Sequence, residues 1–163
     1  MWNGELLKVD AGGSARWGRH VPVNEVERTF CYEADSVFRI YSDTERAYFR
    51  AFFAGMDVIT EAGDVPRGHG QFRLTELDAG GDGQGRNSNG KDELFGTMEW
   101  REVDGRDTGV ITVERGTGRW DGTTGTFNVW FPAFCAFDPA ASYNVTDPLD
   151  TLFFIEGTGH LNR

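Results

Sequence analysis

The segment Glu114–Phe131, ERGTGRWDGTTGTFNVWF, places four glycines within ten residues and follows them with an aromatic run. Such a stretch is either a phosphate-binding loop or a tight turn between two strands. Dinucleotide and Walker loops lie between a parallel strand and a helix, whose N-terminus meets the phosphate. Here strand-like runs flank both sides, and no Gly-Lys-Ser/Thr follows. The stretch therefore predicts a turn at the rim of a barrel, where glycine relieves crowding.

The composition favours an all-β fold. The chain has 163 residues, with 22 glycines, 13 phenylalanines, five tryptophans and four tyrosines. Glycine at this level, without low-complexity repeats, indicates many turns, and aromatic side chains favour strands and bury large areas. A chain of this length is expected to form one domain over residues 1–163.

Alternating runs at short intervals predict consecutive antiparallel strands. Natural hairpin turns separate several of them, at Asp104-Gly105 and Trp120-Asp121-Gly122. A meander this long is expected to close into a single antiparallel barrel of about eight strands, which removes its edges. The expected strands are Glu5–Val9, Glu27–Ser42, 69–77, Leu94–Val103, Thr108–Gly116, Gly125–Phe131 and Leu149–Leu161.

Two places in the first half of the chain break the simple alternation. In Glu27–Ser42, the small and acidic EAD segment predicts a bulge, a kink or a hairpin turn. In residues 43–55, Tyr48, Phe49, Phe52 and Phe53 recur at helical spacing, between a capping Asp43 or Thr44 and a closing Gly55. They predict one short amphipathic helix near a barrel mouth, with another strand as the alternative.

The charge restricts the partners of the chain. With a formal net charge of −10, the protein is expected to bind neither nucleic acid nor an anionic membrane surface. No run approaches a membrane-spanning length, and no secretory signal precedes the domain, so a cytoplasmic location is expected. Cys31 and Cys135 are then expected to be reduced, with Cys31 filling the core, although a disulfide between them stays open. No ligand spacing indicates a metal site or another cofactor.

The segments ERGTGRWDGTTGTFNV and FIEGTGHL resemble the allene oxide cyclase-like β-barrel proteins, a calycin-type group. The likeness covers about Glu114–Leu161. The resemblance implies an eight-stranded barrel with a mainly apolar pocket, often in a homodimer or homotrimer. It also implies stereoselective cyclisation of a reactive hydrophobic substrate, and bacterial barrels of related shape cyclise polyketide intermediates.

Charged residues within apolar strands are the candidates for chemistry. If Glu99 and Glu156 face the lumen, burial would raise their pKa values and make them proton donors or acceptors. Arg39 or Arg101 would then hold a carboxylate or enolate oxygen. The alternative is that all four are solvent-facing strand residues or members of ion pairs on the wall. The candidate substrate-binding side chains are Tyr41, Phe95, Trp100, Trp130 and Phe154.

The sequence thus predicts an enzyme, a cofactor-independent cyclase, isomerase or lyase acting on a hydrophobic natural-product intermediate. Aromatic walls would hold the substrate in a reactive shape, which supplies orientation rather than a covalent step. The alternative is a carrier that binds an apolar ligand without changing it. The polar segment Asp78–Glu93 is expected to be a mobile loop, which would cover the pocket as a lid, with a calcium turn as the alternative.

Overall fold

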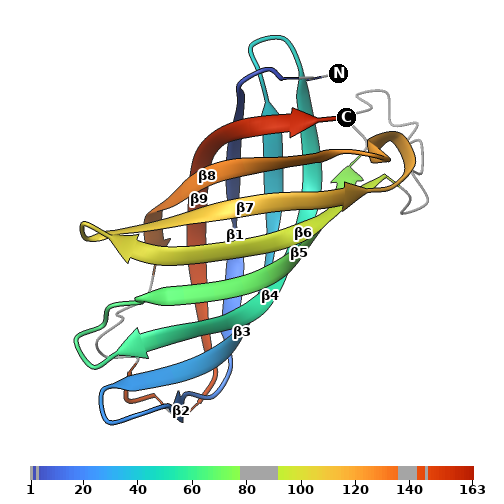
Figure 1. Cartoon of the computed structure of the whole chain (residues 1–163). Helices are drawn as coiled ribbons and strands as arrows, with labels where there is room; N and C mark the ends of the chain where they lie inside the picture. The colour runs from blue at the N-terminus through green and yellow to red at the C-terminus, as the bar shows by residue number, and fades with distance from the viewer. Residues whose placement is uncertain (1, 3, 78–91, 136–142, 146) are drawn as a thin grey trace.

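The computed structural model describes residues 2, 4–77, 92–135, 143–145 and 147–163. Their regular structure is nine strands and one 3-10 turn (Figure 1). The elements are β1 (Leu7–Trp17), β2 (Val21–Pro22), β3 (Glu27–Tyr41), β4 (Arg46–Thr60), β5 (Arg67–Leu77), β6 (Glu93–Val103), β7 (Arg106–Gly116), η1 (Gly118–Trp120), β8 (Thr124–Cys135) and β9 (Leu149–Asn162).

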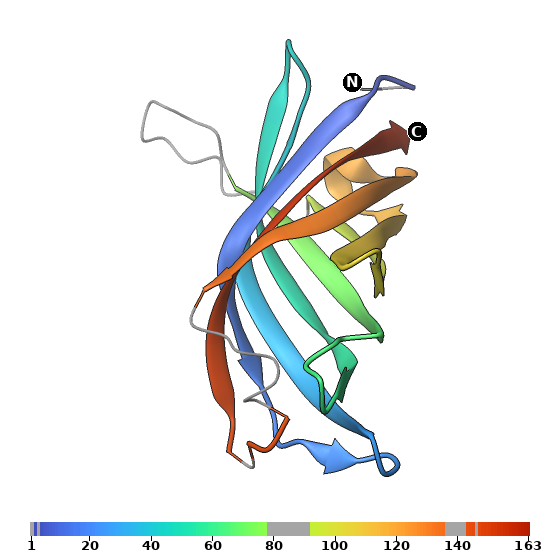
Figure 2. The ribbon, with the colours of Figure 1, turned by 90° about the vertical axis from the view of Figure 1, so that its left-hand side faces the viewer.

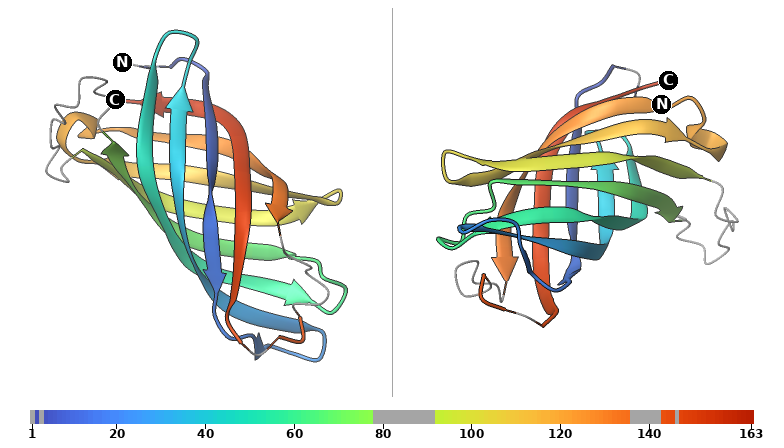
Figure 3. Two further views of the ribbon diagram at one scale, coloured as in Figure 1. Left: turned by 180° about the vertical axis from the view of Figure 1, so that it is seen from behind. Right: turned by 60° about the horizontal axis from the view of Figure 1, so that its bottom comes forward.

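Eight of the strands form a closed antiparallel barrel, which confirms the predicted fold class. The order around the sheet is β1-β9-β8-β7-β6-β5-β4-β3, and β1 closes the ring by pairing with β3 from Lys8↔Tyr41 to Trp17↔Tyr32. Seen from behind, β4, β3, β1 and β9 run side by side (Figure 3). The short β2 is extra and pairs only with β3. Closure satisfies the edge strands that an open sheet would leave unpaired.

The predicted helix over residues 43–55 is wrong, because this segment belongs to β4. The strand alternates, and its inward face carries Ala47, Phe49, Ala51 and Phe53, all buried. Two of the inward positions carry alanine, so the alternation of large apolar and polar residues is weak in the sequence. The spacing of the four aromatic residues therefore matched a helix. Pairing on both sides, with β3 and β5, satisfies the backbone of the strand. Among the described residues, no helix is long and apolar enough to span a bilayer.

The EAD segment does not interrupt β3 either. Residues from Phe30 to Ile40 alternate without a break, and every even-numbered position is buried. Ala34 and Ser36 occupy inward positions between the larger Tyr32 and Phe38. The small residues in this segment therefore face the interior of a continuous strand.

The glycine-rich stretch at Glu114–Phe131 forms a turn, as predicted. β7 ends at Gly116, η1 follows, and β8 begins at Thr124. Gly118 and Gly122 have φ values of 59° and 77°, which glycine adopts without steric cost. Trp120, in the middle of the turn, folds back into the barrel, where its ring lies 5.6 Å from that of Phe49.

The two ends of the barrel differ in how they are filled. β1 begins and β9 ends at one end, which we call the upper end, and β2 lies at the other, the lower end (Figure 2). Large side chains, among them Leu7, Leu94 and Trp120, are buried at the upper end. A barrel of eight strands is just wide enough for side chains to fill its interior or for one small ligand. The lower end of this barrel is the hollow one.

Candidate functional site

A cavity of about 290 Å³ occupies the lower half of the barrel, and we call it the chamber. Its walls come from β1, β3, β4, β6, β8 and β9, and its mouth from residues 63–65 and the β6–β7 hairpin. Six aromatic side chains line it, namely Trp17, Tyr32, Phe53, Trp100, Phe131 and Phe153. Four acidic residues line it as well, namely Asp57, Asp64, Glu102 and Asp107.

The chamber exists because small residues occupy neighbouring inward positions. Ala15 of β1 is the register partner of Ala34 of β3. Gly55 of β4 is the partner of Gly70 of β5. Protein interiors are close-packed, so the small side chains of Ala15 and Ala34, which line the cavity, leave unfilled space. At the upper end, inward alanines such as Ala47 lie beside large buried side chains such as Leu7 and Trp120, which fill the interior.

The glycine pair also makes room for the hydroxyl of Tyr32. A Cβ atom on Gly70 would lie 2.2 Å from Tyr32 Oη, and one on Gly55 would lie 2.8 Å from it. The ring is buried and its hydroxyl has no hydrogen-bond partner in the described structure. Burial raises the pKa of Tyr32, and the nearby charge of Asp57 raises it further. Tyr32 therefore keeps its proton.

A second glycine positions Trp100 against Asp57. Asp57, Gly68 and Trp100 are register partners on β4, β5 and β6. A Cβ atom on Gly68 would lie 1.8 Å from Trp100 Nε1 and 2.0 Å from Asp57 Oδ1. The absence of a side chain at Gly68 lets the indole cross the strand and donate a hydrogen bond to the Asp57 carboxyl.

Asp57 is the most unusual residue of the chamber. It is only 5% exposed, and Oδ1 has no hydrogen-bond partner in the described structure. Burial raises the pKa of Asp57 well above its usual value, Asp107 adds to the rise, and the Trp100 hydrogen bond opposes it. Such a carboxyl favours its protonated form, which can donate a hydrogen bond in a dry site.

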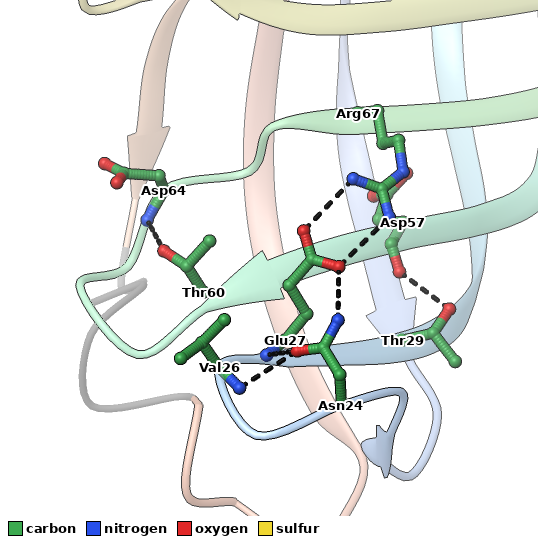
Figure 4. A network of polar contacts seen from close by, with 8 residues as sticks. All are labelled: Asn24, Val26, Glu27, Thr29, Asp57, Thr60, Asp64 and Arg67. Atoms are coloured by element: carbon green, nitrogen blue, oxygen red, sulfur yellow. Dashed lines mark hydrogen bonds and ion pairs between the residues drawn. The ribbon is translucent and has the colours of Figure 1, made fainter.

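Polar contacts fix the strand ends beside the chamber (Figure 4). Arg67 of β5 donates two hydrogen bonds of 3.1 Å to Glu27 of β3, which also accepts one of 3.0 Å from Asn24. Thr29 Oγ1 donates to the backbone oxygen of Asp57 over 3.0 Å. These contacts hold β3, β4 and β5 in register where Asp57 enters the chamber.

The four sequence-predicted catalytic residues lie on the outer face of the barrel. Glu99, Arg101 and Glu156 are exposed, and Arg39 is half-buried in an ion pair with Asp10. The condition for their proposed chemistry, that they face the lumen, is not met. The strand register does bring Arg39, Arg101 and Glu156 into one row across the outer face. Consecutive register partners in this row are Arg101, Thr108, Trp130, Glu156, Asp10 and Arg39.

Of the five predicted substrate-binding residues, Trp100 alone lines the chamber. Trp130 and Phe154 face outwards and are 42% and 54% exposed. Tyr41 and Phe95 lie on the outer face under arginines, with Arg39 and Arg115 each 4.1 Å from the ring centroid. These four residues belong to the surface of the barrel.

Two further expectations concern metal ions and thiols. In the described part of the chain, no three histidine, cysteine or acidic side chains converge closely enough to hold a metal ion. Cys31 is exposed and, among the described side chains, unpaired, so the expectation that it fills the core is wrong. Most of the Asp78–Glu93 segment, for which a lid or a calcium turn was considered, lies outside the described residues. The same holds for the side chain of Cys135.

The sequence analysis did not predict three residues of the site, namely Asp57, Tyr32 and Gly68. The helix expected up to Gly55 hid the alternation of Phe53, Gly55, Asp57 and Ile59, which shows that Asp57 shares the face of two apolar side chains. A carboxylate in phase with buried residues is the signal that would have identified it. Gly68 and Gly70 alternate in the same way with Arg67 and His69.

Comparison with known proteins adds no assignment. No protein-family model, no curated protein and no solved structure matches this chain.

Proposed function

We propose that this protein binds a small, mainly apolar carbonyl compound in the chamber and uses its own side chains to catalyse the cyclisation or isomerisation of that compound. The observation that carries the proposal is Asp57, a buried carboxyl that lines an aromatic chamber and has one oxygen without a partner among the described residues. A passive apolar cavity does not need such a group, and burying one without a partner costs free energy. Unpartnered polar groups of this kind are concentrated at functional sites.

In the proposed mechanism the aromatic walls fold the substrate into a reactive shape. The rings of Tyr32, Trp100 and Phe131 would pack against its flat, unsaturated parts. Protonated Asp57 would donate a hydrogen bond to the carbonyl oxygen, where negative charge develops in the transition state. A cyclisation that uses the substrate's own π electrons needs no net proton transfer, so this one donor suffices.

The size of the chamber limits the substrate. At about 290 Å³ it lies near the lower end of the range for ligand pockets, about 300–1,000 Å³. A flexible substrate would therefore have to be compact inside it, which is the shape that ring closure requires.

Binding in the chamber can be tested with N-phenyl-1-naphthylamine, a neutral dye that fluoresces in apolar surroundings. Ala34→Phe would fill the chamber and should abolish the fluorescence gain, since Ala34 lines the cavity. Ala54→Phe is the matched control, because Ala54 lies on β4 and faces outwards. Equal binding by both variants would show that the dye binds elsewhere.

Turnover can be tested with a synthetic probe that carries a conjugated diene and a tethered unsaturated ketone. Ring closure leaves the mass unchanged, removes the diene absorbance and changes the chromatographic retention. Asp57→Leu should slow it about a hundredfold, as for loss of a transition-state hydrogen-bond donor, and Asp57→Asn should retain part of the rate through its N–H group. If the wild type binds the probe and releases it unchanged, the protein is a carrier for this compound class.

Membership of the allene oxide cyclase-like group stays a prediction, as does a homodimer or homotrimer. An exposed apolar patch on β3, β4 and β9, formed by Val37, Phe52, Leu152 and Phe154, is where subunits would meet. Light scattering of Leu152→Glu/Phe154→Glu beside the wild type tests this, since two charges in an apolar interface should dissociate an oligomer.

A further inference from the structure

We propose that the carbonyl compound bound in the chamber is also an organic cation, with a protonated amine attached to its apolar body, and that its nitrogen lies at the mouth between Glu102 and Asp107. The inference rests on the function proposed above, and it names the class of substrate.

The first observation is uncompensated negative charge. The chamber lining contains four acidic residues and, among the described residues, no lysine, arginine or histidine. None of the four takes part in the ion pairs of the described structure. On the outer wall of the barrel, by contrast, Asp10, Asp35 and Glu27 each pair with an arginine. The mouth therefore attracts a cation that the described side chains do not supply.

Glu102 and Asp107 are placed as a pair. They are direct cross-strand partners on β6 and β7, two residues from the Asp104-Gly105 turn. Both are half-buried, and like charges directly opposite each other destabilise a sheet. Burial raises the pKa of Asp107, and the charge of Glu102 raises it further. A cation between the two carboxylates would reduce their mutual repulsion and would stabilise the charged form of Asp107.

The second, independent observation is Asp57, deeper in the same chamber. Its side chain is nearly inaccessible and has an unpaired oxygen, as described above. It also interacts electrostatically with Asp107. Carboxyl oxygens therefore line the chamber from its mouth to its interior with no cationic partner among the described residues, and an ammonium group is a compact source of donors for them.

The aromatic walls select an organic cation rather than a metal ion. The Trp100 ring lies 5.2 Å from Tyr32, and 5.3 Å from Phe131 at an angle of 89°. The faces of aromatic rings that line a cavity attract an alkylammonium group and the carbon atoms beside it. A metal ion would need converging oxygen ligands instead, and among the described side chains no such group exists.

Three probes of the same shape test the inference by calorimetry at neutral pH. They are 2-(1-naphthyl)ethylamine, which is a cation, 2-(1-naphthyl)ethanol, which is neutral, and 3-(1-naphthyl)propionate, which is an anion. The wild type should bind the amine at least about tenfold more tightly than the alcohol, and the propionate most weakly. Raising the salt concentration from about 50 mM to about 500 mM should weaken binding of the amine and leave binding of the alcohol unchanged.

Glu102→Gln/Asp107→Asn keeps the shape of both side chains and removes their charges. It should reduce the ratio of amine to alcohol affinity to about twofold or less while retaining alcohol binding. The matched control, Glu33→Gln/Glu114→Gln, removes two exposed carboxylates from the outer face and should retain the full ratio. The wild-type salt dependence provides a test that does not require the variant to fold.

The outcomes separate this inference from the proposed function. If the wild type binds alcohol and amine equally, the chamber takes up ligands but does not select cations, and only the inference fails. It also fails if the preference survives in Glu102→Gln/Asp107→Asn, or if the control variant loses it equally. If no probe binds, and the neutral dye does not bind either, the proposed function fails with it.

Discussion

Replacing Tyr32 with phenylalanine isolates a single buried oxygen atom. The hydroxyl lies against the backbone of Gly55 and Gly70 and has no hydrogen-bond partner in the described structure. The ring itself is 4% exposed, and its centroid lies 5.2 Å from that of Trp100. Tyr32→Phe should keep the ring contacts and remove only the unpaired polar group.

The expected change in stability follows from two opposing contributions. A buried hydroxyl without a partner costs about 1–3 kcal/mol in protein mutational data. The lost oxygen also gives up a few van der Waals contacts of about 0.1–0.2 kcal/mol each. The free energy of unfolding of the variant should therefore be about 1 kcal/mol higher than that of the wild type. In a chain of this size, this corresponds to a rise of about 2–4 °C in Tm.

Urea and thermal unfolding of the ligand-free protein, followed by circular dichroism, would measure this difference. Tyr41→Phe is the control, because Tyr41 lies on the outer face under Arg39, and it should change stability by less than about 0.5 kcal/mol. A loss of more than about 1 kcal/mol in Tyr32→Phe would mean that the hydroxyl makes a stabilising hydrogen bond, which would refute this description of the chamber.

Three further predictions concern the same region and the outer face. Folding raises the pKa of Asp57, so protonation of this carboxyl stabilises the folded state. This stabilisation is fully present when the pH is below the ordinary pKa of about 3.9, and it is lost as the pH rises through the raised pKa. Asp57→Asn should therefore resist urea better than the wild type at neutral pH, with a gain that shrinks towards pH 4, whereas a pH-independent difference would contradict the assignment. Gly68→Ala would place a Cβ atom 1.8 Å from Trp100 Nε1, so it should cost about 1–3 kcal/mol and change the tryptophan emission, and unchanged spectra would exclude the described contact. Glu99→Gln and Glu156→Gln should leave binding of the neutral dye within about twofold of the wild type, and a larger loss would locate the binding site on the outer face.

The helix expected over residues 43–55 shows where local patterns mislead. Tyr48, Phe49, Phe52 and Phe53 fit one face of a helix, but in β4 Phe49 and Phe53 point inwards, and Phe52 is 40% exposed. Neighbouring strands pair with both sides of this segment, and that pairing outweighs a weak local preference for helix.

The candidate site was misplaced for a related reason. Period-two alternation separates the two faces of a strand but does not say which face is inside. In β9, Leu152 and Phe154 on one face are as apolar as Phe153 and Ile155 on the other, yet the first pair is exposed and the second is buried. The catalytic prediction for Glu99 and Glu156 therefore depended on a condition, that they face the lumen, which the sequence left open.

Local residue patterns were enough to predict antiparallel strands joined by tight turns. That information is local, since aromatic alternation favours strands, and turns such as Asp104-Gly105 need backbone angles that few residues adopt. The tertiary structure alone decided which faces turn inwards and where the barrel is hollow. The positions of the chamber side chains depend on the alignment of Gly55 with Gly70, beside the Tyr32 hydroxyl, and of Gly68 with Asp57 and Trp100. Their register is set when the barrel closes, because only closure buries one face of every strand at the same time.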